Sequence, residues 1–152
     1  MLRIHISKSQ RQLHIYEGNV LLHQFPIGIG KQSGGPKETE GDHRTPEGQY
    51  KIICKNPQSK YHLSLGLDYP NPADAERGLA MGILSQDEYQ SILDAHSNSS
   101  PIPWKTPMGG EIFIHGAFEE GDGSQGCIRM YKQDIETVFT LIPKGTPVEI
   151  VD

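Results

Sequence analysis

Residues 112–130 read Ile-Phe-Ile-His-Gly-Ala-Phe-Glu-Glu-Gly-Asp-Gly-Ser-Gln-Gly-Cys-Ile-Arg-Met, and they carry the clearest structural signal of the chain. Residues 111–115 are a short apolar strand that ends at His115. The next eleven residues, 116–126, contain four glycines and are typical of a loop. Because this loop returns the chain to Cys127, we expect the side chains of His115 and Cys127 to be able to meet.

Cys127 follows a glycine at the end of a loop, a position that suits a nucleophile. Gly126 lets a substrate approach the backbone closely, and the amides around Cys127 are free to point at a developing oxyanion. A helix predicted shortly afterwards and the charge of Arg129 both favour thiolate over thiol. A buried structural cysteine explains the same local pattern, so the pattern alone leaves both interpretations open.

His115 supplies the group that a nucleophilic thiol needs. A neutral imidazole within hydrogen-bond reach accepts the thiol proton, and the resulting imidazolium stabilises the thiolate. The alternative is a histidine at a strand end that is bonded to the backbone.

Alternating apolar and polar residues extend from this stretch toward both ends of the chain. The pattern predicts strands at 2–6, 49–54, 61–67 and 147–151, and a hairpin of 13–16 and 20–25 around the turn 17–19. One helix begins with a capping box from Ser85 to Glu88 and continues to His96, and a second covers 134–142. With 17 glycines, 11 prolines and no repeat or linker, residues 1–152 are predicted to form a single, mainly β domain with two short helices.

Several of these segments together resemble one protein family. Ile114-His115-Gly116, followed by Ser-Gln-Gly-Cys-Ile-Arg-Met at 124–130, resembles the signature of the L,D-transpeptidase catalytic domain, the YkuD-like family. Weaker similarities cover 13–30, the Thr-Pro-Glu-Gly turn within 41–50, the segment 67–71 and the ending 145–148. The ordered set is specific for the family and implies a β-sandwich of the L,D-transpeptidase type.

The resemblance implies a role for each residue of the signature. Cys127 would be the nucleophile, His115 the general base, and the backbone carbonyl of Gly116 the third member of the catalytic group. Ser124 would shape the loop, and the amides of Gly126 and Cys127 would contribute to an oxyanion hole. Arg129 would contact a substrate carboxylate or hold the loop. Gln125 replaces a basic residue of many members, which affects substrate orientation.

Two neighbouring segments allow two interpretations each. Residues 78–103, which include the first predicted helix, lie outside the minimal family pattern and either cover the groove as a lid or serve packing. The acidic run Glu119-Glu120-Gly121-Asp122 is either a solvated loop or an attractor for the amine of an acyl acceptor.

The charge and hydropathy of the chain limit the classes of binding partner and the compartment that we expect. Lys and Arg number 14 against 19 Asp and Glu, and the net charge of −5 argues against nucleic acid or an anionic membrane as the main partner. No apolar run approaches a membrane span, and residues 1–6 lack the pattern of a signal peptide. The chain is expected to be cytoplasmic, or to act in the periplasm or cell envelope as a mature form whose export signal was removed.

The two cysteines are too few for a disulfide scaffold, although one disulfide is possible. Cys54 is expected to be a buried strand residue, and nothing in the sequence requires a metal or cofactor. We expect a monomer.

Three functions are compatible with this sequence. The first is a cysteine acyltransferase that acts on peptidoglycan stem peptides through a thioester on Cys127, a reaction of cell-wall biogenesis. The second is a hydrolase of the same fold, either an L,D-carboxypeptidase or a peptidoglycan amidase. The third is a non-catalytic cell-wall-binding module. The resemblance also implies that carbapenem β-lactams acylate Cys127.

Overall fold

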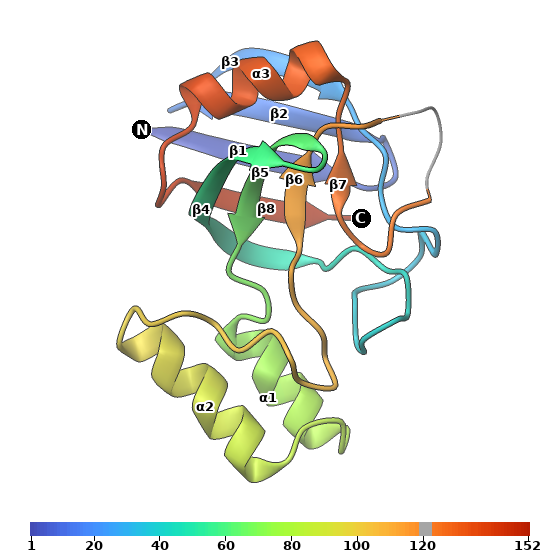
Figure 1. The fold of residues 1–152 in the computed structure, drawn as a ribbon, viewed down its shortest axis with the longest axis vertical. Helices are drawn as coiled ribbons and strands as arrows, with labels where there is room; N and C mark the ends of the chain where they lie inside the picture. Colours follow the sequence, from blue (N-terminus) through green and yellow to red (C-terminus); the bar gives the residue numbers. More distant parts are fainter. Residues whose placement is uncertain (119–122) are drawn as a thin grey trace.

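The computed structural model describes residues 1–118 and 123–152. In this part of the chain, eight strands form one curled sheet with the order β3-β2-β1-β8-β4-β5-β6-β7, accompanied by three helices (Figure 1). The mainly β fold class is therefore confirmed. The elements are β1 (Leu2–Ser7), β2 (Gln12–Glu17), β3 (Val20–Pro26), β4 (Gly48–Ser59), β5 (His62–Leu67), α1 (Pro72–Ala80), α2 (Gln86–Ser97), β6 (Phe113–His115), β7 (Ile128–Arg129), α3 (Lys132–Leu141) and β8 (Pro147–Val151).

The N-terminal strands follow the predicted alternation. Ile4 and Ile6 of β1 point into the core, and β1 pairs antiparallel with β2, which pairs antiparallel with β3. The predicted turn at 17–19 is confirmed, with Gly18 at a φ of 59°. β8 lies between β1 and β4, parallel to the first and antiparallel to the second. The last strand of the chain therefore occupies the middle of the sheet.

The other end of the sheet carries the signature residues. β5 pairs antiparallel with β6, and β6 pairs parallel with β7. The two segments that lead to Cys127 and away from it are also tied to the chain after β3, because Gly28 pairs with Arg129 and Gly30 pairs with Ser124. These bridges fix the loop before Cys127 against the body of the sheet.

Two of the helices occur where the sequence predicts them. The capping box of α2 is present: the Ser85 side chain accepts from the Glu88 amide at 3.1 Å, and the Glu88 carboxylate accepts from the Ser85 amide at 2.8 Å. α3 starts at Lys132, two residues before the predicted start, and buries Ile135 and Val138 against the sheet.

A third helix, α1, was not predicted. It begins with a second capping box, formed by Asn71 and Asp74, with Pro72 in its first turn. These signals are present in the sequence, but the helix is only nine residues long and most of its apolar residues are alanines. Asp74 also accepts a hydrogen bond from the Tyr50 hydroxyl at 2.7 Å, which ties α1 to β4.

The buried apolar side chains form two clusters. The large one fills the sheet and the inner face of α3, and the small one, between α1 and α2, contains Ala75, Leu84, Ile92 and Met108. The Tyr69 hydroxyl donates to the Met108 carbonyl at 2.8 Å, between the two. The helical pair lies below the sheet in Figure 1, beyond the end of β5 and before the start of β6.

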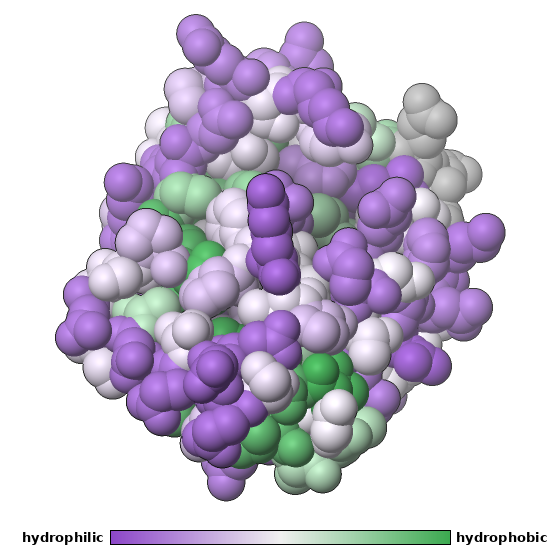
Figure 2. Space-filling view, turned by 60° about the horizontal axis from the view of Figure 1, so that its bottom comes forward, coloured by the Kyte–Doolittle hydropathy of each residue, from purple (hydrophilic) through white to green (hydrophobic). Residues whose placement is uncertain are grey.

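Figure 2 brings this helical end forward and shows a largely hydrophilic surface that contains a small hydrophobic patch. None of the described helices combines the length and apolar character that a helix needs to cross a bilayer.

Candidate active site

A cleft of about 520 Å³ lies at the β6–β7 end of the sheet. It collects side chains from four separate parts of the chain, among them both His115 and Cys127. Its described walls include no residue of the segment 78–103, which supports the packing interpretation of that segment. The lining residues are Lys37, Glu40, Gly41, Lys60, Tyr61, Gly110, Glu111, Ile112, Phe113, His115, Ala117, Gly123, Ser124, Gln125, Cys127 and Arg129.

The register of β6 and β7 places His115 and Cys127 on the same face. Ile114 is opposite Ile128, and His115 is opposite Arg129. Side chains alternate along each strand, and opposite residues share a face. Cys127 directly precedes β7 and lies two residues before Arg129, so the same alternation, continued by one residue, places it on the side of His115, and both residues line the cleft.

The imidazole of His115 is held in one orientation and one tautomer. Its Nδ1 donates to the Gly116 carbonyl at 2.5 Å, and its ring stacks on Tyr61 with centroids 4.2 Å apart. Because a carbonyl only accepts, the neutral ring carries its proton on Nδ1 and leaves a lone pair on Nε2. The side chain is only 4% exposed, and this burial lowers the pKa of His115 below its ordinary 6.5. The ring is therefore a neutral base at neutral pH.

The thiol of Cys127 contacts the backbone that precedes β6. Its Sγ accepts from the Phe113 amide at 3.4 Å and donates to the Glu111 carbonyl at 3.4 Å. Burial raises the pKa of the Cys127 thiol above 9.0 and outweighs the opposing effects of the Phe113 amide and the charge of Lys37. This direction opposes the expected preference for thiolate, because desolvation of the thiol favours its neutral form.

The loop before Cys127 is held by its own hydrogen bonds. The Ser124 hydroxyl donates to the Cys127 carbonyl at 2.7 Å and accepts from the Gly126 amide at 3.1 Å. The Gly126 amide is thus engaged inside the loop, which differs from the expectation that it faces an oxyanion together with the Cys127 amide. The Ser124 side chain thus connects two positions of this loop, Gly126 and Cys127.

Gln125 and Arg129 lie on the walls of the cleft. The Arg129 backbone exchanges hydrogen bonds with Gly28 at 2.8 and 2.9 Å, so the base of the side chain is fixed. Its guanidinium lies 5.8 Å from the centre of the Phe118 ring. The acidic run 119–122 lies outside the described residues.

Three cleft residues were not anticipated from the sequence. Tyr61 covers His115, Lys60 lies with its ammonium 4.9 Å from the centre of the Tyr61 ring, and Lys37 pairs with Asp42 at 2.9 Å. Lys60 and Tyr61 belong to the β4–β5 connection and lie more than fifty residues before the signature. No local pattern links such positions to Cys127, because only the pairing of β5 with β6 brings them there.

Cys54 and Cys127 are both free thiols. Cys54 lies in β4 and is half-buried rather than buried, at the wall of a separate cavity of about 480 Å³ between the sheet and residues 95–104. The possible disulfide is absent.

Gly126 is a position where the site depends on a glycine. Its φ is 135°, and a Cβ there would lie 2.8 Å from the Arg44 carbonyl oxygen. We expect Gly126→Ala to lower the free energy of unfolding by about 2–4 kcal/mol, from backbone strain and the displaced segment together. Urea unfolding measures this. Gly34→Ala, where a Cβ meets open space, should change stability by less than about 0.5 kcal/mol; equal effects of the two substitutions would contradict the argument.

The chain is similar to known proteins in sequence and in fold. The sequence profile of the L,D-transpeptidase catalytic domain, YkuD, matches residues 2–150. YafK of Escherichia coli (strain K12) is 35% identical over 83 residues, which are 49% of this chain and 33% of YafK. YkuD of Bacillus licheniformis is 26% identical over 148 residues, which are 97% of this chain and 64% of that protein. Both carry L,D-transpeptidase in their names.

A solved structure shows the same fold. The helical cell shape determining protein Pgp2 from Campylobacter jejuni superposes with a TM-score of 0.68 at 22% identity, over 99% of this chain and 47% of Pgp2. The chain thus spans less than two thirds of the length of each of these proteins. Since the profile covers almost all of its residues, this chain belongs to the YkuD family of L,D-transpeptidase catalytic domains.

Proposed function

We propose that residues 1–152 form a cysteine acyltransferase domain that acts on peptidoglycan stem peptides through a thioester on Cys127. The observation that carries this proposal is that Cys127 and His115 line one cleft, with Nδ1 of His115 bonded to the Gly116 carbonyl. A thiol and an oriented neutral base that share one cleft are the groups that acyl transfer needs.

In the first half-reaction, Sγ of Cys127 attacks the carbonyl carbon of the L,D-peptide bond that precedes the terminal D-amino acid. The thiol proton passes to Nε2 of His115, and the π electrons of the carbonyl move onto its oxygen. When this tetrahedral intermediate collapses, the C–N bond breaks and the leaving amine takes the proton from His115. The D-amino acid departs, and the acyl group remains as a thioester.

In the second half-reaction, the amine of another stem peptide attacks the thioester carbonyl. His115 accepts the proton of this amine, the C–S bond breaks, and the proton returns to the departing sulfur. The neutral resting state of both groups suits this sequence, because His115 must accept a proton at the start of each half-reaction. The thiolate need exist only while bonds change.

The cleft offers cationic side chains to a peptide that carries carboxylates. Lys60, Arg129 and Gln125 line it, together with Glu40 and Glu111, whereas Lys37 is buried and paired with Asp42. An Arg fork binds a carboxylate with two parallel hydrogen bonds, so we assign Arg129 and Gln125 to substrate orientation. The substrate lies in the cell envelope, where we propose that this domain acts.

Incubation with tetrapeptide muropeptides tests the proposal. Cross-linked dimers together with released D-amino acid are the expected products by mass spectrometry. Tripeptide without dimers would instead identify an L,D-carboxypeptidase. A chain that binds muropeptides equally well after Cys127→Ala and forms no product would be a binding module, and the acyltransferase proposal would be rejected.

A further inference from the structure

We propose that Lys8 and Thr45 are positioning residues that hold the Gly126–Cys127 peptide so that its N–H faces the cleft as an oxyanion donor. The inference rests on the proposed function and adds to it a buried network behind the active site. Neither residue lines the cleft.

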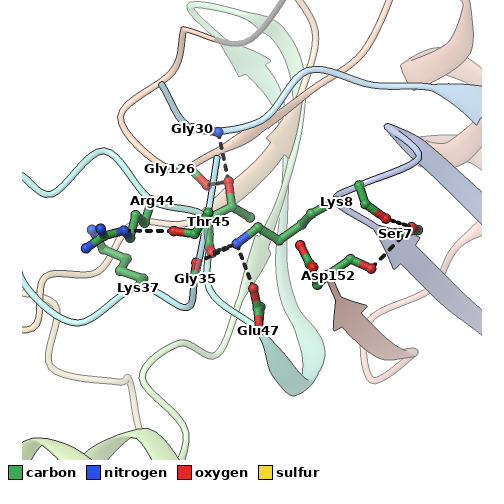
Figure 3. Close-up of polar contacts among 12 residues, drawn as sticks. Ser7, Lys8, Gly30, Gly35, Lys37, Arg44, Thr45, Glu47, Gly126 and Asp152 are labelled. Atoms are coloured by element: carbon green, nitrogen blue, oxygen red, sulfur yellow. Dashed lines mark hydrogen bonds and ion pairs between the residues drawn. The ribbon is translucent and has the colours of Figure 1, made fainter. Parts of the chain in front are cut away.

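Lys8 lies directly after β1 and is fully buried, with 0% exposure. Its ammonium donates to the Gly35 carbonyl at 2.7 Å, to the Thr45 carbonyl at 2.8 Å and to the Glu47 carboxylate at 3.1 Å (Figure 3). All three of its N–H donors are therefore used. Lysine is among the residues least often fully buried, and here its stem and charge join the end of β1 to the segment before β4.

Thr45 connects Lys8 to the loop that precedes Cys127. It is fully buried, and its hydroxyl donates to the Gly126 carbonyl at 2.8 Å while accepting from the Gly30 amide at 2.9 Å. Figure 3 shows Thr45 between the ammonium of Lys8 and the backbone of Gly126. A single hydroxyl therefore links three segments that are far apart in the sequence.

The hydrogen bond from Thr45 to the Gly126 carbonyl also sets the orientation of the Gly126–Cys127 peptide unit. In a planar trans peptide the C=O and the N–H of the same unit point in opposite directions. The Gly126 carbonyl points to Thr45, which lies in the interior, so the Cys127 N–H points to the opposite side. Because Cys127 lines the cleft and Thr45 does not, that side is the cleft. The Gly126 amide is already engaged by Ser124, so the orientation of the Cys127 amide gains importance.

An oxyanion donor acts only if it is held in place before charge develops on the carbonyl oxygen. Without the Thr45 hydroxyl, the glycine at 126 would let this peptide unit rotate. Loss of this network should therefore slow the reactions of Cys127 at a carbonyl carbon, where an oxyanion forms. It should not slow displacement at a saturated carbon, where no oxyanion forms.

Two small reagents that react with Cys127 separate these cases. With p-nitrophenyl acetate, sulfur bonds to the acetyl carbon, p-nitrophenolate leaves with the bonding pair, and His115 takes the thiol proton. With iodoacetamide, sulfur displaces iodide from a CH₂ group, and His115 again takes the proton. The rate of each reaction is measured on the peptide that contains Cys127, by digestion and mass spectrometry, so that labelling of Cys54 does not contribute.

We expect Thr45→Val to slow acylation by about 10-fold or more and alkylation by no more than about 2-fold. Thr45→Ser keeps the hydroxyl and should restore the acylation rate. Thr146→Val is the matched control, since the Thr146 hydroxyl is also buried and also donates to a carbonyl, that of Pro143 at 2.7 Å, away from the cleft. It should leave the ratio of the two rates unchanged.

Lys8→Met should lower the ratio of the acylation rate to the alkylation rate by about 3- to 10-fold, because Thr45 loses the contact that holds its backbone. If Thr45→Val does not fold, as judged by circular dichroism, Thr45→Ala is measured instead, because water can occupy the space that it leaves. Equal changes in both rates, or no change in either, would overturn the inference.

Failure of the proposed function looks different. An unsubstituted chain that is acylated by p-nitrophenyl acetate but does not turn over muropeptides would reject the substrate class, while the ratio in Thr45→Val still decides the positioning role. An unsubstituted chain that is alkylated but not acylated would overturn the inference, because no oxyanion chemistry exists for the network to support.

Discussion

Replacing Cys127 by serine should lower acyl transfer by at least about 10⁴-fold. The only base that the proposal invokes is the neutral imidazole of His115, whose pKa is lowered by burial. Such a base can take a proton from a thiol, but a serine hydroxyl is a far weaker acid, so proton transfer to His115 becomes much less favourable. Turnover of tetrapeptide muropeptides measures the effect.

A covalent probe gives a second measurement of the same substitution. The carbapenem imipenem should add one equivalent to the unsubstituted chain, visible by intact mass, and none to Cys127→Ser. Cys54→Ser is the matched control, because Cys54 is the second free thiol and lies at a separate cavity. It should keep full turnover and the adduct. Persistent turnover in Cys127→Ser, or its loss in Cys54→Ser, would remove Cys127 from the proposed role.

Replacing His115 by alanine should lower turnover by about 10²- to 10⁴-fold, the usual contribution of a positioned general base. The substitution also removes the ring that Tyr61 covers. His23→Ala, in the edge strand β3, is the control and should change turnover by less than about 2-fold. A His115→Ala variant with full turnover would show that another group takes the thiol proton.

The pH dependence follows from the two pKa directions. The pKa of His115 lies below 6.5 and that of Cys127 lies above 9.0, so at neutral pH the pair is imidazole and thiol. Lowering the pH through the His115 pKa protonates the base, and kcat/KM should fall there. Above this pKa we expect a plateau that extends to about pH 9, and the acid limb should disappear in His115→Ala.

A preformed ion pair would produce the opposite profile. Thiolate and imidazolium coexist only between a low thiol pKa and a high imidazole pKa, so kcat/KM would decline as the pH rises above the imidazole pKa. A profile in which kcat/KM passes through a maximum and falls as the pH rises above the imidazole pKa would therefore contradict the neutral pair that burial favours in this cleft.

The strands could be predicted from the sequence because their signals are local. Ile4 and Ile6 alternate with polar residues, and the capping box of Ser85 and Glu88 places a helix start within four residues. The same kind of signal, from Asn71 to Asp74, marks α1, which was missed because a short helix whose apolar residues are mostly alanines shows little apolar periodicity. Such signals need no knowledge of which segments become neighbours.

The candidate nucleophile and base also belong to one local stretch, so the sequence by itself indicated both candidates and the family. Only the tertiary structure decided their ionisation, because the pKa of His115 and that of Cys127 depend on how much water the surrounding strands exclude. It also placed β8 at the centre of the sheet and brought Lys8 and Thr45 behind Gly126. These contacts join residues separated by 37 and 81 positions, and no spacing rule connects such positions before the chain has folded.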